Sequence, residues 1–454
     1  MMNKETIIKV ETALGETEEA DIDDGIGQGG VESGILSAKS LDGGVTQYFS
    51  DHTGNVFYGK IEIKCLLWQD DVMKVNGSVK DAQDSNKRME AVLSSKMLSF
   101  NEKKSVAIVI GSKKSRDKIK KELEESPLML CNKKMKMVET YSYLGEVISE
   151  EGVGDSALKT VSKRCGIAYK AIFEIKAIIE DTRSKVPGAF MTAEMIWKLS
   201  VLPALLNSAE CWTDLPKQAL DKLNRLQETY YQVILNCPVT SPKPGLYWFT
   251  GGMMMMNHII QRKLLFLWHL FHLDGNSLGK EVLETQRRFE TGFWTECLAY
   301  MMEMDISLEE LENTTKMQWK SRVKLATKLK NKNDLLKMME PYKKLDSRDF
   351  HDDEFETKSY FHELTLSQAR TKFSIDIQML KTVKSCYPSQ KSNEDELWEC
   401  SQCCRVDSIR HLYTCPGFSL QRMNKKIWTR VQDLVTYMQE IIEIRMADEQ
   451  AQKS

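Results

Sequence analysis

The sequence predicts an α+β protein that is mostly helical, with a small antiparallel sheet near its N-terminus, a longer helical region and a compact C-terminal module. Short apolar and β-branched runs separated by turn residues lie before residue 150, which is typical of short strands. Beyond residue 155 the apolar residues recur at helical spacing. Cysteines and a histidine then cluster between residues 400 and 415, which indicates a metal site rather than disulfides.

Composition limits the class of protein. The chain has 454 residues, of which 42% are hydrophobic and 28% charged, so it can bury more than one core. The formal net charge of -2 gives no global argument for nucleic-acid binding, so any basic surface must be local. No apolar run is long enough to span a bilayer, and the N-terminus lacks the apolar core of a signal peptide. We therefore expect an intracellular protein without a membrane partner.

The clearest strand signal surrounds an acidic pair. The run from Ile61 to Trp68 is apolar, is interrupted by Gln69, Asp70 and Asp71, and resumes as Val-Met-Lys-Val. Two apolar arms around a polar centre predict a β-hairpin with the aspartates at its tip. Upstream, we expect no strand in the acidic, glycine-rich segment that precedes residue 60.

The other expected elements follow in order along the chain. Residues 82–98 have helical spacing, Val106–Ile110 predicts a buried strand ending at Gly111, and Met137–Ile148 predicts a strand pair. Pro238, Pro242 and Pro244 are expected to interrupt the helical pattern that follows. Expected helices are 157–180, 188–211, 216–236 and 259–271, with further helical structure over 300–385.

The pair Asp70 and Asp71 suits two-metal phosphoryl transfer. That chemistry needs carboxylates that hold two Mg²⁺ ions about 3.5–4 Å apart, and a tight hairpin is one way to fix them. An Asp-Asp pair by itself is more often an acidic surface turn. The apolar arms on both sides favour the rim of a sheet instead.

Four short motifs in sequence order resemble the palm of non-LTR retrotransposon and group II intron-like reverse transcriptases. Gly27-Gln28-Gly29 resembles the turn near the incoming nucleotide and template, and Trp68-Gln69-Asp70-Asp71 resembles the metal-binding Asp-Asp box. Asn101 and Lys104 resemble the following Asn-x-x-Lys element, and Tyr143-Leu144-Gly145 resembles the hairpin that grips the primer. The resemblance implies RNA-templated DNA synthesis with Mg²⁺ on Asp70 and Asp71, an RNA template, a DNA primer or target, and action in the nucleus.

The sequence departs from that family at one point. Polymerases of this class take another metal-binding aspartate from a strand upstream of the Gln-Gly turn, after a fingers subdomain. Residues Glu5 to Glu19 show no apolar strand carrying an aspartate, and Asp21, Asp23 and Asp24 lie close to the turn. We therefore expect a fragment truncated before the first catalytic aspartate, and inactive by itself.

The C-terminal cluster has the spacing of a zinc module. Its ligands would be Cys400, Cys403, His411 and Cys415, because Cys-x₂-Cys forms a tight knuckle and one helical turn can present the last two. Cys404 is an alternative to Cys403. The module resembles the Cys-Cys-His-Cys motif near the C-terminus of many non-LTR elements, where it is associated with nucleic-acid binding. No nuclease-type acidic cluster follows it, so we expect no endonuclease domain.

Two basic segments are further candidates for nucleic-acid contact. Lys163, Arg164, Lys170 and Lys176 lie on the first helix after the palm, which in the family is part of the thumb. A second group surrounds Trp319, which could stack on a base. The alternative for both is a solvated helix face. The second group contains Lys316, Lys320, Arg322, Lys324, Lys328, Lys330 and Lys332.

Three hypotheses remain open at this stage. The first is a reverse-transcriptase fragment, the second a zinc-dependent nucleic-acid-binding protein without enzymatic activity, and the third a decayed element or truncated gene product. Oligomeric state and template preference have no sequence signal. The expected segments are a partial palm over 1–150, a helical thumb and connector over 151–300, a Lys-rich helical linker region over 301–394, the zinc module over 395–420 and a C-terminal helix over 421–454.

Overall fold

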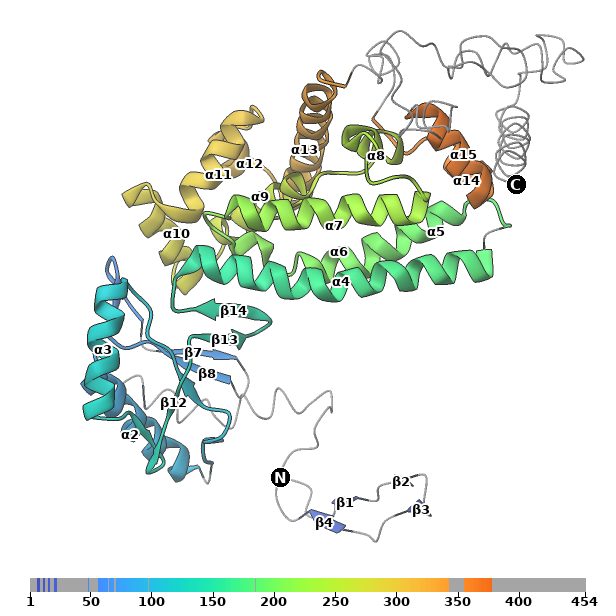
Figure 1. Ribbon diagram of the computed structural model, residues 1–454. Coiled ribbons are helices and arrows are strands. Elements are labelled where there is room, and N and C mark those ends of the chain that lie inside the picture. Colours follow the sequence, from blue (N-terminus) through green and yellow to red (C-terminus); the bar gives the residue numbers. More distant parts are fainter. Residues whose placement is uncertain are drawn as a thin grey trace, which may run out of the picture. The chain divides into compact units, whose positions relative to one another are not determined.

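The computed structural model is mostly helical and carries several small sheets, as the fold class predicted (Figure 1). Its described residues divide into two compact units. The first unit comprises Met1–Gly152 and Gly275–Phe289, and the second comprises Val153–Asp274 and Glu290–Ser454. The structure describes residues 6–8, 11–12, 15–16, 20–22, 48, 56–63, 65–68, 71–96, 98–183, 185–342 and 355–377.

The strands of the first unit pair two by two throughout the described residues. All pairs are antiparallel except β9 with β12. The strands are β1 (Thr6–Ile8), β2 (Glu11–Thr12), β3 (Gly15–Glu16), β4 (Ala20–Ile22), β5 (Phe57–Tyr58), β6 (Ile61–Glu62), β7 (Cys65–Trp68), β8 (Asp71–Lys74), β9 (Val106–Ala107), β10 (Met129–Leu130), β11 (Lys133–Lys134), β12 (Lys136–Met137), β13 (Thr140–Tyr143) and β14 (Glu146–Ser149).

Two expectations about these strands are wrong. The N-terminal segment does contain strands, and Asp21 lies in β4, where it pairs with Ile7 of β1. The run Val106–Ile110 is not a buried strand: only its first two residues pair with β12, and Ile110 is 56% exposed. Its β-branched composition satisfies strand propensity, but burial depends on what packs against the strand, which local composition does not specify.

Helix α2 (Val79–Ser95) packs against the β7–β8 hairpin and forms the small core of the first unit. Met89 and Leu93 of the helix meet Tyr48 and Cys65 there, and the Tyr48 hydroxyl lies 2.7 Å from Ser85 Oγ. The helix begins at Ser78, whose side chain accepts a hydrogen bond from the Asp81 amide, an N-cap that satisfies one of the free donors of the first turn. Helices α3 (Lys113–Glu125) and α10 (Leu278–Phe289) complete the unit.

The second unit is a helical assembly built around α4 (Val153–Arg183) and α7 (Lys217–Leu235), which lie side by side (Figure 1). The predicted helices 157–180, 216–236 and 259–271 are confirmed, with shifted ends, whereas the predicted helical stretch 188–211 is divided into four shorter helical segments. Its other helical segments are α5 (Ala189–Ile196), the π-helix Trp197–Val201, α6 (Leu202–Leu205), the 3-10 helix Ala209–Cys211, α8 (Lys243–Thr250), α9 (Met255–Phe271), α11 (Gly292–Glu303), α12 (Leu308–Asn313), α13 (Lys316–Met339), α14 (Tyr360–Glu363) and α15 (Leu366–Asp376).

Aromatic residues fill the core of this second unit. Trp197 stacks on Tyr230 with ring centroids 4.4 Å apart, and Phe190 stacks on Phe361 at 4.1 Å. The prolines expected to interrupt the helices do so only in part, because Pro244 lies in the first turn of α8. A proline there loses no helical hydrogen bond, since the first amides of a helix have no acceptor within it.

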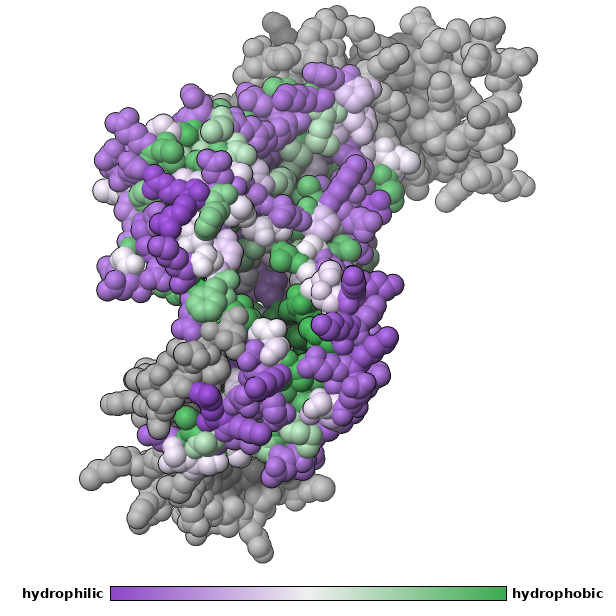
Figure 2. All heavy atoms as spheres, turned by 90° about the vertical axis from the view of Figure 1, so that its left-hand side faces the viewer, coloured by the Kyte–Doolittle hydropathy of each residue, from purple (hydrophilic) through white to green (hydrophobic). Residues whose placement is uncertain are grey.

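None of the helices within the described residues combines the length and apolar composition that crossing a membrane requires. Hydrophilic residues dominate the face shown in Figure 2, with apolar residues interspersed among them.

Candidate functional site

Asp71 of the acidic pair lies where the sequence predicted, at the end of a hairpin strand. Strands β7 and β8 are antiparallel, and Trp68 pairs with Asp71, so residues 69 and 70 connect the two strands. Asp71 is exposed as the first residue of β8, and Trp68 beside it is 59% exposed. Asp70 itself lies outside the described residues. The hairpin therefore presents at least one carboxylate to solvent at its end.

Below its tip the hairpin is firmly anchored. Leu67 and Val72 pack against the core that α2 completes. At the far end of β8, the Lys74 ammonium donates to Asn86 Oδ1 of α2 and lies 5.6 Å from the centre of the Phe100 ring. Burial lowers the pKa of Lys74 to about 8. A carboxylate on a strand that is held by core packing and by a hydrogen bond keeps a fixed position, which a metal ligand requires.

The hairpin that contains Tyr143 also forms as predicted. Strands β13 and β14 pair with Tyr143 opposite Glu146, and the two residues between them, Leu144 and Gly145, have positive φ angles of 49° and 82°. Positive φ at both central residues is the pattern of a type I′ turn, which suits the twist of a two-residue hairpin.

Tyr143 and Asp71 are far apart in the sequence but belong to the same unit. Burial and then the Asp71 carboxylate raise the pKa of the Tyr143 hydroxyl. The tip of the acidic hairpin and the end of the second hairpin therefore belong to one region of the first unit.

Asn101 and Lys104 form an exposed turn. The Lys104 amide donates to the Asn101 carbonyl at 3.1 Å and to its side-chain Oδ1 at 3.2 Å. The Ser105 amide donates to the same carbonyl at 3.0 Å. This spacing has a structural basis, because the asparagine side chain stabilises its own turn.

The remaining predicted site residues lie outside the described residues. They are Gly27, Gln28 and Gly29 of the turn upstream, and Cys400, Cys403, His411 and Cys415 of the zinc module, together with Cys404. Within the described ranges, no three side chains of His, Cys, Asp or Glu come together as a metal-binding group.

The two basic segments differ in structure. On α4, Lys163, Ile167, Lys170, Glu174 and Ile178 are exposed and share one helix face by their spacing, and Ile167 is 67% exposed. Arg164 is not part of that face, because it donates to the Asn207 carbonyl at 2.6 Å.

The proposed stacking of a base on Trp319 is wrong. Trp319 of α13 is 1% exposed, and its indole N–H donates to the Leu264 carbonyl at 2.8 Å. Helical periodicity turns it toward the core while the lysines around it face outward. Several of those basic residues bind acidic partners: Arg322 pairs with Glu310 and Lys330 with Glu303.

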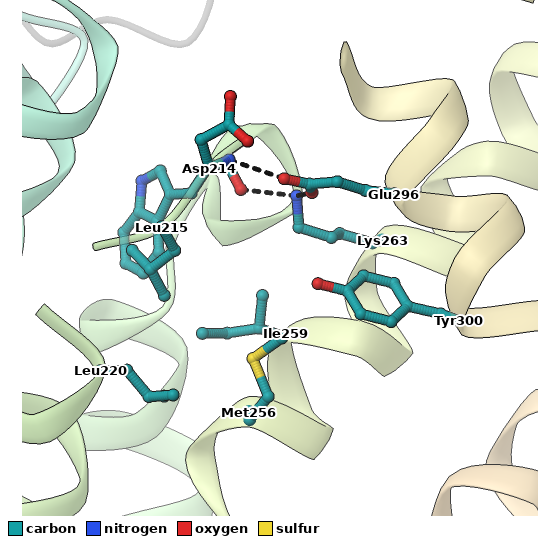
Figure 3. A pocket seen from close by; sticks show the side chains of 9 residues that line it. Asp214, Leu215, Leu220, Met256, Ile259, Lys263, Glu296 and Tyr300 are labelled. Atoms are coloured by element: carbon teal, nitrogen blue, oxygen red, sulfur yellow. Dashed lines mark hydrogen bonds and ion pairs between the residues drawn. The ribbon is translucent and has the colours of Figure 1, made fainter. Parts of the chain in front are cut away.

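Sequence reasoning missed a pocket in the second unit (Figure 3). Its polar edge contains Lys263 of α9, which is 1% exposed, and Glu296 of α11. Lys263 Nζ lies 2.7 Å from Glu296 Oε2. Tyr300 of α11 lines the same pocket. The available signal was helical spacing: Lys263 lies four residues from both Ile259 and Leu267, which puts it on an apolar helix face, and a lysine there is buried only with a partner.

No protein-family model matches the chain, and no curated protein is similar to it.

Proposed function

We propose that this chain is part of an RNA-directed DNA polymerase of the non-LTR retrotransposon type. The support comes from the order of its elements: an acidic hairpin, an Asn-x-x-Lys turn, a second hairpin at Tyr143 and then a helical unit. This order matches the palm followed by the thumb in the family that the sequence resembles. We propose the activity for a protein that also carries fingers and a further aspartate, and we expect the chain alone not to extend a primer.

Two hairpins of the first unit carry this proposal: β7–β8, which ends at Asp71, and β13–β14, which contains Tyr143, whose pKa the Asp71 carboxylate helps to raise. In the proposed role, Asp70 and Asp71 hold Mg²⁺, which would stabilise the charge that develops on the phosphoryl oxygens. Tyr143-Leu144-Gly145 would hold the primer end near the same carboxylates.

Mn²⁺ binding tests the metal site. A paramagnetic ion at Asp71 would broaden the indole N–H signal of Trp68, which Trp68→Phe identifies, at Mn²⁺ concentrations that leave the other tryptophan signals sharp. Asp71→Asn should abolish the selective broadening, whereas Asp81→Asn on α2 should not. Equal broadening of Trp68 in the Asp71→Asn protein would contradict the proposed site.

The second candidate is a nucleic-acid-binding protein without polymerase activity. The α4 face favours it, because Lys163 and Lys170 alternate there with exposed Ile167 and Ile178. Lys170 also lies 3.6 Å from the Glu174 carboxylate, an exposed ion pair that phosphate would have to replace. Lysines can neutralise phosphates while apolar side chains contact sugars in a minor groove. The proposed zinc module would add a second contact surface and would require its metal to fold.

Salt-dependent binding to an RNA–DNA duplex tests this candidate. Lys163→Gln with Lys170→Gln should weaken binding and reduce the salt slope by about one for each phosphate that the protein no longer neutralises. Lys324→Gln on α13 is the matched control. Cys400→Ser should weaken binding and release zinc, and substituting Cys403 or Cys404 separately would identify the second cysteine ligand. Affinity that does not change on zinc removal would count against this role for the module.

A further inference from the structure

The pocket beside Lys263 has the size of a small-ligand site. It encloses about 240 Å³ between α9, α11, the start of α7 and the segment that follows the 3-10 helix. A cavity of roughly 150 Å³ in an apolar core can hold one benzene ring, so this space is sufficient for one ring or two fused rings.

One side of the pocket is lined by apolar side chains. Leu215, Leu220, Met256 and Ile259 surround the open space (Figure 3). The buried Trp212 also lines the pocket. These side chains come from separate parts of the chain that meet only in the folded unit. Their flat and aliphatic surfaces suit a planar apolar molecule.

The polar edge is rigid and its main charges are paired. Lys263 Nζ donates to the Trp212 carbonyl at 2.5 Å and to Glu296 Oε2 at 2.7 Å. Glu296 Oε1 accepts from the Asp214 amide at 2.6 Å. With Asp214 also at the rim, the two carboxylates outnumber the one ammonium, so the pocket disfavours an anion.

Tyr300 supplies a hydrogen-bond donor directed into this space. Figure 3 shows its hydroxyl pointing into the pocket, between Lys263 and Ile259. Among the described residues no side chain or backbone group is its hydrogen-bond partner. Burial and the neighbouring carboxylate of Glu296 raise its pKa to about 12, so the hydroxyl keeps its proton at neutral pH.

We propose that this pocket binds an uncharged planar aromatic molecule of one ring or two fused rings that carries a hydrogen-bond acceptor, with the Tyr300 hydroxyl as its donor. The apolar walls supply most of the binding energy, and the Tyr300 hydroxyl fixes the orientation. This site is separate from the acidic hairpin, which belongs to the first unit, and the proposal does not depend on the polymerase assignment.

Two probes of equal shape test the proposal on the full chain. Quinoline carries a ring nitrogen as acceptor, and naphthalene has the same outline without one. In protein labelled at the methionine methyl groups, the Met256 signal, identified by Met256→Leu, should shift saturably with both. Quinoline should bind more tightly, and Tyr300→Phe should weaken quinoline about tenfold, the value of one hydrogen bond, while leaving naphthalene unchanged.

The controls separate binding from folding. Tyr169→Phe on α4 is a matched substitution that should change neither affinity. Leu220→Trp should fill the space and remove both shifts, with an unchanged circular dichroism spectrum as evidence that the unit is folded. Absence of a saturable Met256 shift would overturn the proposal. So would equal quinoline affinity in the Tyr300→Phe protein, or tighter binding of quinoline-2-carboxylate than of quinoline.

Discussion

Asp71 and Tyr143 show at the scale of single residues how the candidate site is assembled. Each lies at the end of a strand next to a two-residue connection, so each side chain is placed by a hairpin whose register is fixed. The Asp71 carboxylate contributes to the raised pKa of Tyr143 because a negative charge nearby disfavours a phenolate. The pair is therefore open to a direct electrostatic test.

Removing the charge of Asp71 should lower the pKa of Tyr143. We expect Asp71→Asn to bring the pKa of Tyr143 part of the way back toward 10, because burial, the larger cause of its rise, remains. An NMR titration of the Tyr143 ring carbon, identified with Tyr143→Phe, measures this. Asp81→Asn should leave the titration unchanged, and an unchanged pKa in the Asp71→Asn protein would mean that the two residues are not neighbours.

Trp319 has a structural role that mutation can confirm. Trp319→Phe removes the hydrogen bond to the Leu264 carbonyl and part of a buried ring system. We expect the free energy of unfolding to fall by about 1–2 kcal/mol. Lys320→Gln on the exposed side of α13 should change it by less than about 0.5 kcal/mol. Chemical denaturation gives both values, and a Trp319→Phe protein with full stability and reduced RNA affinity would restore the stacking hypothesis.

At the scale of elements, the acidic hairpin depends on its contact with α2. Lys74 is the polar link: it lies at the end of β8, donates to Asn86 of the helix and has a pKa lowered to about 8 by burial. The Lys74 amine therefore binds a proton less strongly in the folded unit than in the unfolded chain, where its pKa is 10.5.

This difference in pKa predicts how stability changes with pH. Between pH 8 and 10.5 the unfolded state holds more protons at Lys74, so the contribution of this residue to stability rises with pH. From pH 7.5 to 9.5 the rise is roughly 2 kcal/mol. Urea denaturation gives the free energy of unfolding of the original chain and of Lys74→Met. The difference between these two free energies should grow by roughly 2 kcal/mol over this pH range. Lys60→Met, at an exposed turn, is the control, and parallel pH profiles for the original chain and Lys74→Met would contradict the burial of Lys74.

Hairpins and amphipathic helices were the elements that sequence predicted best, since their signals are local. The β7–β8 hairpin follows from two apolar arms around an acidic centre, and α7 follows from apolar residues at helical spacing. The strand β4 was missed because its residues Ala-Asp-Ile carry little strand propensity, and its pairing with β1 is not local. Helix α3 was missed because its sequence is dominated by lysine and glutamate and has too few apolar residues to show a clear helical period.

At the scale of the whole molecule, contacts between distant segments were beyond the reach of the sequence. The order of motifs indicated a palm-like unit, but the electrostatic effect of Asp71 on Tyr143 came only from the structure. The pocket at Tyr300 gave no motif either, because its lining comes from several helices and a connecting segment. Motifs report residues that are close in sequence, whereas a site is made of residues that are close in space.

The central claim is that Tyr143 and Asp71 lie where a primer end meets the metal site. A DNA primer with a photoreactive 3′-terminal base, annealed to an RNA template, tests this most directly. We expect its cross-link within residues 141–145, dependent on Mg²⁺ and reduced by Asp71→Asn. Cross-links confined to other segments, or a cross-link at Tyr143 that needs neither Mg²⁺ nor Asp71, would contradict the polymerase assignment.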